Sequence, residues 1–288
     1  MITEIAPAKI NLYLHVGGLR DDGLHDLASL FVFTCNGDNI SVTPSDVLSL
    51  SVGGAFAGGL NDLPPEKNLI WQAAALLQKE FSIARGAEIL LEKNLPIAAG
   101  IGGGSADAAA AIRALIKLWN VEITDAALSR LAFKLGADVP ACLKGAPVNV
   151  TGAGEETSPG PTLPPLWACI VNPHVDMPTG PVFRAFDAAT PSPSPPLLEA
   201  LCGDDYDAVA ALMRDTRNDL EPMARVIAPE IGATLAFLGQ QSGAIAARMS
   251  GSGATCFALF STLDAAKRTQ NYARNKGWWA LASPLSIR

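Results

Sequence analysis

The chain has 288 residues, of which 49% are hydrophobic and 17% are charged, and its net charge is -7. This composition is ample to bury a core and excludes a disordered chain. At this length one large domain or two smaller ones are expected, and we expect two. No Lys or Arg residues form a run, so the acidic balance argues against a nucleic-acid partner.

The five cysteines and three histidines indicate neither a disulfide framework nor a metal site. The cysteines are odd in number and contain no C-x-x-C pair, and the histidines show no metal spacing. We interpret the cysteines as reduced core thiols. The N-terminus lacks the features of a signal peptide, and the longest apolar tract, residues 108–119, is too short for the ~20 residues of a membrane span. We expect a cytosolic protein without a membrane segment.

The first half of the chain predicts strands that alternate with helices. Residues 9–16 are rich in β-formers, and residues 87–93 alternate apolar and acidic side chains with the period of a half-buried strand. A long alanine-rich helix is expected from about Ser105. A second helix has Thr124 as N-cap and Gly136 as its stop, and one apolar face. That face would carry Leu128, Leu131 and Leu135.

A proline-rich stretch, residues 158–165, interrupts the pattern after a short strand at 148–151. We place a domain boundary there, giving domains 1–157 and 158–288. Because no βαβ period is present, the pattern predicts an α+β fold with helices on an antiparallel or mixed sheet. In the second half we expect strands at 167–171, 245–249, 255–260 and 278–282, helices at 205–213, 229–240 and 264–276, and a loop at 190–196.

The strongest site signal is the glycine loop from Gly100 to Ser105 at the start of the alanine-rich helix. A helix N-terminus offers unpaired N–H donors, and glycines let the backbone approach a phosphate. The loop matches neither a Walker A motif nor G-x-G-x-x-G, and a tight turn without ligand is the alternative. A second glycine loop, residues 249–254, is alone an ordinary hairpin turn. Together, two such loops in two domains suggest a cleft lined by backbone amides from both sides, which suits a phosphorylated ligand bound between the domains.

Three polar residues are ambiguous when they are considered singly. Asp138 precedes Val139-Pro140 in an expected extended context, where an Asx turn is favoured over a placed base. Lys9 lies where a strand should begin, and such lysines usually extend to solvent. His25 lies in the polar loop DGLHDL, where a surface position is the commoner outcome, and a ligand hydrogen bond is the alternative.

Three segments together resemble the GHMP kinase superfamily: PAKINLYLHV from Pro7, LPIAAGIGGGSADAA from Leu95 and MSGSGATCFALF from Met249. Their order and spacing match over essentially the whole chain. Within that superfamily, PAKINL, DGLHDL, KNLI and LGADVP are similar to the family of 4-diphosphocytidyl-2-C-methyl-D-erythritol kinases. The resemblance implies a ribosomal protein S5 domain 2-like N-terminal domain that holds ATP and a ferredoxin-like C-terminal domain. It also implies an ATP-dependent kinase that phosphorylates the C2 hydroxyl of the cytidyl substrate in isoprenoid biosynthesis.

The same resemblance implies site residues and overrides the ordinary interpretations of Lys9 and Asp138. Asp138 would be the general base, with Lys9 nearby to orient it, and Mg²⁺ would accompany ATP. Where the family commonly has Tyr, this chain has Leu24, which lacks a π-face for base stacking worth ~1–3 kcal/mol. The residues implied on the substrate side are Asn11, His25, Asp138, Thr179 and Phe183. Those implied on the ATP side are Asn68, Lys93, Pro96, Ile97, Ala98, Ala99, Gly100, Ile101, Gly102, Gly103, Gly104, Ser105 and Ala106.

Two alternatives stay open at this point. One is another GHMP kinase of the homoserine or mevalonate type, which a cytidine nucleotide would not protect against heat. The other is a catalytically silent nucleotide-binding protein that keeps the glycine loops. The presence of both Lys9 and Asp138 argues against the silent protein.

Overall fold

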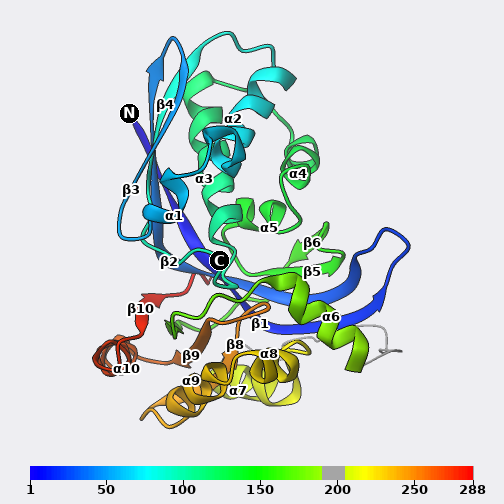
Figure 1. Ribbon diagram of the computed structural model, residues 1–288, viewed down its shortest axis with the longest axis vertical. Helices are drawn as coiled ribbons and strands as arrows, with labels where there is room; N and C mark the ends of the chain where they lie inside the picture. The colour runs from blue at the N-terminus through cyan, green and yellow to red at the C-terminus, as the bar shows by residue number, and fades with distance from the viewer. Residues whose placement is uncertain (190–204, 288) are drawn as a thin grey trace. The chain divides into compact units, whose positions relative to one another are not determined.

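The computed structural model describes residues 1–189 and 205–287 of the chain (Figure 1). The chain divides into two compact units. Unit 1 consists of Met1–Ala8, Asn36–Ile97 and Gly102–Lys144, and unit 2 of Lys9–Cys35, Ala98–Ile101 and Gly145–Arg288. The loop expected at 190–196 lies outside the described residues. The sequence boundary expected between residues 157 and 158 stays a prediction.

Two long strands, β1 (Ile2–Leu19) and β2 (His25–Ser45), contribute residues to both units. The strand expected at 9–16 is confirmed as the middle of β1, where every residue is buried. β2 was not predicted from the sequence. Its first half carries a run of buried apolar residues, Leu30 to Phe33, rather than the alternation that marks a half-exposed strand.

In unit 1 the strand order is β3-β4-β2, with β3 (Leu48–Gly53) parallel and β2 antiparallel to β4 (Gly86–Glu92). The expected alternation in β4 is confirmed, because Ile89 and Leu91 are buried while Glu88 and Glu92 are exposed. The helical elements of this unit are α1 (Gly58–Asn61), a 3₁₀ turn η1 (Pro65–Lys67), α2 (Leu69–Glu80), α3 (Gly103–Trp119), α4 (Asp125–Phe133) and α5 (Val139–Lys144).

Helix α3 is the centre of unit 1, and α2 and α5 pack against it. The helix is almost fully buried from Ala106 to Ala111, since alanine lets neighbouring helices approach closely. The expected N-cap of α4 is confirmed: the Thr124 hydroxyl accepts from the backbone N–H of Ala127 at 3.3 Å.

Two local predictions in unit 1 are wrong. Leu135 does not share a helical face with Leu128 and Leu131, because α4 ends at Phe133 and a turn follows. The backbone at Val139-Pro140 is not extended either, because both residues begin α5. A proline is tolerated in the first turn of a helix, where its missing N–H has no intrahelical partner.

Unit 2 contains an antiparallel sheet with the order β10-β7-β9-β8, and α9 and α10 pack against it. Separately, β5 and then β6 pair beside the first part of β2. The strands and helices predicted here are confirmed, and three further elements of the described chain, at residues 156–159, 179–189 and 221–227, were not predicted. The strands are β5 (Val148–Gly152), β6 (Glu156–Pro159), β7 (Trp167–Asn172), β8 (Ala244–Met249), β9 (Cys256–Phe260) and β10 (Trp279–Pro284), and the helices are α6 (Thr179–Ala189), α7 (Tyr206–Asp215), α8 (Glu221–Ile227), α9 (Glu230–Gly239) and α10 (Leu263–Asn275).

A buried guanidinium fastens β8 within unit 2. Arg248 donates to the carbonyl of Leu12 at 2.6 Å, to the Thr216 hydroxyl at 2.9 Å and to the carbonyl of Met213. Burial lowers the pKa of Arg248 to about 10. The side chain thereby ties β8 to β1 and to the end of α7, immediately before the second glycine loop.

The cysteine prediction is confirmed in part. Cys142, Cys169 and Cys256 are buried free thiols, but Cys35 is exposed because it takes the outward face of β2 next to buried Thr34. Cys202 lies outside the described residues. No helix in the described part of the chain combines the length and apolarity that a membrane crossing requires.

Candidate functional site

The two glycine loops are in direct contact within unit 2. Gly100 has φ +73°, and a Cβ there would lie 2.6 Å from the carbonyl oxygen of Gly253 and 2.7 Å from that of Ser250. The Ser250 hydroxyl donates to the Gly100 carbonyl at 3.1 Å, and the Thr255 N–H donates to the Ala99 carbonyl at 3.3 Å. The second loop therefore packs against the first and supports it. The sequence had suggested that the two loops line opposite walls of a cleft, and this prediction is wrong.

A polar network in turn fixes the second loop. The amide of Asn218 donates to the carbonyls of Met249 at 2.9 Å and Gly251 at 2.8 Å. The backbone N–H of Asn11 donates to the Ser250 hydroxyl at 3.3 Å, and its side-chain amide donates to Ser29 at 3.0 Å. Asn11, a predicted substrate-side residue, is thus buried in this network. Asn218 was missed, because a single asparagine before a helix carries no distinguishing pattern.

The N-terminus of α3 in unit 1 is open to an anion. Its N-cap is Gly102, with φ +62°, which has no side chain to satisfy the first helical N–H groups. The Ala106 N–H donates to the Gly102 carbonyl at 2.9 Å, which closes the first turn. Gly104 is exposed and Ser105 half-buried. These uncapped donors and the helix dipole suit a phosphate group.

Lys93 lies buried beside this helix start and pairs with two carboxylates. Its Nζ is 2.6 Å from Asp38 Oδ2 and 2.6 Å from Asp107 Oδ2. It would also lie 3.2 Å from a Cβ added to Gly103. Asp38 Oδ1 accepts from the backbone N–H of Leu95 at 2.8 Å, so the cluster joins β2, the end of β4 and the first turns of α3. Neither aspartate was predicted.

The cluster has one ammonium group for two buried carboxylates. The pKa of Asp107 is raised to about 7, chiefly by burial and also by the charge of Asp38, while the Lys93 ammonium opposes the rise. Burial alone would lower the pKa of Lys93, but the two aspartates raise it overall. Both pKa values are therefore raised for one reason: a single cation compensates one carboxylate and leaves the second carboxylate costly to ionise. Asp107 Oδ1 is buried without a hydrogen-bond partner in the described structure.

The remaining residues predicted for catalysis and ATP lie in both units. In unit 1 the Asn68 side chain caps α2, accepting from the Ile70 N–H at 2.9 Å. Asp138 is half-buried in the turn before α5, and its carbonyl accepts from Cys142. In unit 2 Lys9 is buried, with its Nζ 4.3 Å from the Phe31 ring centroid. The pairing of Lys9 with Asp138 stays a prediction.

His25, Thr179 and Phe183 belong to a cluster on one face of α6 in unit 2. The His25 ring centroid is 4.9 Å from that of Phe183, and His25 Nε2 is 2.7 Å from Asp187 Oδ1. The Thr179 hydroxyl is 3.0 Å from that of Ser252 in the second glycine loop. His25 is 8% exposed, so it is a buried histidine and not a surface one. Asp187 was missed, although its position four residues after Phe183 places it on the same helical face.

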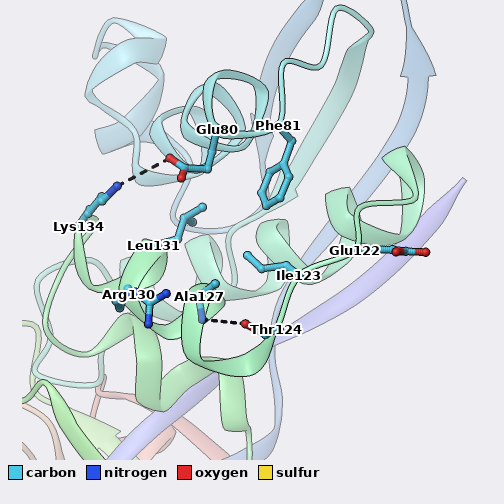
Figure 2. Close-up of a pocket in the computed structure, with 9 residues that line it drawn as sticks. All are labelled: Glu80, Phe81, Glu122, Ile123, Thr124, Ala127, Arg130, Leu131 and Lys134. Carbon is cyan, nitrogen blue, oxygen red and sulfur yellow. Dashed lines mark hydrogen bonds and ion pairs between the residues drawn. The ribbon is translucent and has the colours of Figure 1, made fainter.

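A separate pocket of about 410 Å³ lies in unit 1 between the end of α2 and the start of α4 (Figure 2). Phe81 and Leu131 form its apolar part, and Glu80 pairs with Lys134 at 3.8 Å on its edge. None of the predicted site residues lines it. The pocket therefore does not belong to the glycine-loop site.

Comparison with known proteins decides among the kinases left open by the sequence. Residues 68–146 match the family model of the GHMP kinases N terminal domain, and residues 197–277 match that of the GHMP kinases C terminal. The chain is 44% identical to 4-diphosphocytidyl-2-C-methyl-D-erythritol kinase of Paramagnetospirillum magneticum, over 97% of each chain. It is 47% identical to that of Hyphomonas neptunium, over 97% of this chain and 95% of the other.

The chain belongs to the 4-diphosphocytidyl-2-C-methyl-D-erythritol kinase family. A crystal structure of 4-(cytidine 5'-diphospho)-2C-methyl-D-erythritol kinase is 34% identical, covers 99% of both chains and has a TM-score of 0.80. A homoserine kinase from Cytophaga hutchinsonii has a TM-score of 0.72 at 21% identity, which shows a shared fold alone. These findings confirm the predicted α+β, two-domain GHMP kinase fold and the assignment of the chain to the kinases.

The contact between the glycine loops predicts a specific effect of Gly100→Ala. The substitution forces a side chain into the left-handed region and against two backbone carbonyls. We expect a loss of roughly 2 kcal/mol or more in the free energy of unfolding, measured by urea titration. Gly18→Ala in this kinase is the matched control, because nothing lies within 4 Å of its added Cβ. Equal stability of the two variants would contradict the described packing.

The buried carboxylate pair predicts a pH dependence that Asp107→Asn removes. Folded Asp107 keeps its proton up to about pH 7, whereas the ordinary pKa is 3.8. Between these values the folded state binds the additional proton, so the wild type should lose stability relative to the variant as pH rises. The expected slope is at most about 1.4 kcal/mol per pH unit, with no further change above pH 7. Urea unfolding of both proteins at pH 5, 6, 7 and 8 measures it; a wild-type stability that stays constant or rises relative to Asp107→Asn between pH 5 and pH 7 would refute the shift.

Proposed function

We propose that this protein transfers the γ-phosphoryl group of ATP to the C2 hydroxyl of 4-diphosphocytidyl-2-C-methyl-D-erythritol, giving the 2-phosphate and ADP. The observation that carries the proposal is the sequence identity of 44%, over 97% of both chains, to a kinase with this substrate in its name. We further propose that the reaction takes place in the cytosol, in the supply of isoprenoid precursors.

The ATP side of the proposal rests on the glycine loop and the start of α3. We assign the phosphates of ATP to the segment from Pro96 to Ala106. The uncapped first turn of α3 supports this assignment, because its N–H groups have no side chain from Gly102 to satisfy them. Lys93 then contributes indirectly, because its ion pairs hold the start of α3 in place. Asn68 likewise contributes by capping the N-terminus of α2. Phosphoryl transfer is catalysed mainly by positioning of the reacting groups and by stabilisation of their charge, and a fixed helix start contributes to both.

The acceptor side rests on Asp138 and on the residues around α6. We assign Asp138 as the general base that takes the proton of the C2 hydroxyl while the hydroxyl oxygen bonds to the γ-phosphorus and the bond to ADP breaks. Lys9 would orient this carboxylate and stabilise the charge. We assign Asn11 and Thr179 to the substrate, His25 to the cytosine edge, and Phe183 to stacking on the base. The closeness of His25 and Phe183, 4.9 Å between ring centroids, supports a shared base site.

Mg²⁺ is proposed to enter with the nucleotide. The described residues contain no group of three or more His, Cys, Asp or Glu side chains suited to hold a metal ion. Mg²⁺ commonly keeps several waters and binds through substrate phosphates with few protein ligands, so this donor set fits an ion delivered by ATP. When bound, the ion neutralises phosphate charge.

A coupled ADP-release assay with MgATP tests the substrate assignment. The cytidyl-methylerythritol substrate is compared with homoserine and mevalonate under the same conditions. Turnover with the cytidyl substrate alone supports the proposal. Turnover with another acceptor would move the function within the GHMP kinases, and no turnover with any of the three would indicate a silent nucleotide-binding protein.

Asp138→Asn tests the general base. Loss of a general base costs about 10²–10⁴ in rate, so kcat should fall by that factor while ATP affinity stays nearly unchanged. Steady-state kinetics and a nucleotide-binding titration measure the two quantities. Asp125→Asn, an exposed acid in the first turn of α4, is the control and should turn over normally. Near-normal turnover of Asp138→Asn would remove this residue from the mechanism.

A further inference from the structure

The hydrogen bond between His25 and Asp187 suggests how the base site distinguishes cytosine. The imidazole is buried, its Nε2 lies 2.7 Å from Asp187 Oδ1, and the carboxylate side chain is 41% exposed. A carboxylate is an acceptor only, so the neutral ring must carry its proton on Nε2. Nδ1 is then the acceptor nitrogen of the ring, because the hydrogen bond at one nitrogen fixes the tautomer.

The ring orientation is also constrained by aromatic neighbours on the same helix. Phe183 lies 4.9 Å away with a tilt of 37°, and Phe186 lies 6.4 Å away edge-on at 76°. Asp187 follows Phe183 by one helical turn, so α6 supplies both the aromatic contact and the carboxylate. A rigid ring with a defined tautomer presents one fixed hydrogen-bonding pattern to a ligand.

We propose that Asp187 is a specificity-determining positioning residue, which fixes the Nε2-protonated tautomer of His25 so that Nδ1 accepts a hydrogen bond from the 4-amino group of cytosine. Uracil carries an oxygen at this position, and two acceptors would then face each other. This inference rests on the proposed function, in which His25 contacts the cytosine edge. Asp187 does not touch the reacting atoms and acts through His25.

The first measurement reads the tautomer directly. The full chain is labelled with ¹⁵N-histidine, and the spectrum is recorded at pH 8.5, where ordinary imidazoles are neutral. The chain has three histidines, so His25→Gln assigns the resonance. We expect a protonated Nε2 and an unprotonated Nδ1 that shifts on addition of CDP. In Asp187→Ala the ring should become a mixture of tautomers, and Asp187→Glu should restore the wild-type pattern. An Nδ1-protonated or doubly protonated ring in the wild type would overturn the inference.

The second measurement reads base selectivity without phosphoryl transfer. The ratio of CDP to UDP affinity, from calorimetric titration, should fall roughly tenfold or more in Asp187→Ala, because one hydrogen-bonded base contact loses its discrimination. ATP affinity should stay unchanged. Asp26→Asn is the matched control: Asp26 is adjacent to His25 in sequence but pairs with Arg20 at 3.5 Å.

The outcomes separate this inference from the proposed function. An unchanged CDP to UDP ratio in Asp187→Ala, or a wild type without a preference for CDP, overturns the assignment of Asp187 even when the cytidyl substrate is turned over. A wild-type preference for CDP that is lost in Asp187→Ala and restored in Asp187→Glu supports the assignment, even if the ADP-release assay were to show no turnover.

Discussion

The close backbone approach between the two glycine loops is the constraint on which the proposed phosphate site depends. Gly100 contacts Gly253 and Ser250 at distances that exclude a Cβ, and the Gly251 side of the contact is equally tight, with an added Cβ 2.8 Å from the Gly100 carbonyl. Such an approach requires glycine, and hydrogen bonds from the Asn218 side chain and the Asn11 backbone N–H hold the second loop in place. The separate motifs of the sequence therefore act as one structural unit, in which the later loop holds the shape of the earlier one.

A second constraint is electrostatic and lies in unit 1. Lys93 is the single cation for two buried carboxylates, and breaking such a cluster by removing one partner typically costs ~3–5 kcal/mol. Replacement of the whole cluster by apolar groups would often be neutral, so stability alone is a weak reason to keep it. Its location offers another reason: Asp38 accepts from the backbone after β4, Lys93 directly follows β4, and Asp107 lies in α3. The cluster fixes the direction in which α3 leaves the strand, and hence the direction of its N–H groups.

Much of the fold was predictable because the local signals were strong. Period-2 alternation identified β4, a threonine cap identified α4, and the glycine turn identified the hairpin of β8 and β9. The first half of β2 lacks alternation because it is buried on both faces, whereas residues 38–43 do alternate and their pattern was overlooked. The helical turn at Pro140 was misjudged, since the proline rule that favours extended backbone before it competes with the rule that places proline at a helix start. The site residues implied by family resemblance are ones with distinctive neighbours in sequence. Asp38, Asp107 and Asp187 have no such pattern and are identified by contact alone.

On α6, the contacts in the structure identify Asp187, a residue that the family resemblance did not imply. Thr179, Phe183 and Asp187 are spaced by four residues and share one face of the helix. Thr179 contacts the second glycine loop, Phe183 contacts the His25 ring, and Asp187 pairs with His25 Nε2. The family resemblance implies an aromatic residue at the position of Leu24, whose aliphatic side chain offers no π-face to the base. Stacking is tolerant of base identity, whereas hydrogen bonding is selective. A chain that stacks less on one side depends more on the hydrogen-bonding edge for selectivity, and that edge is set by the tautomer that Asp187 imposes on His25.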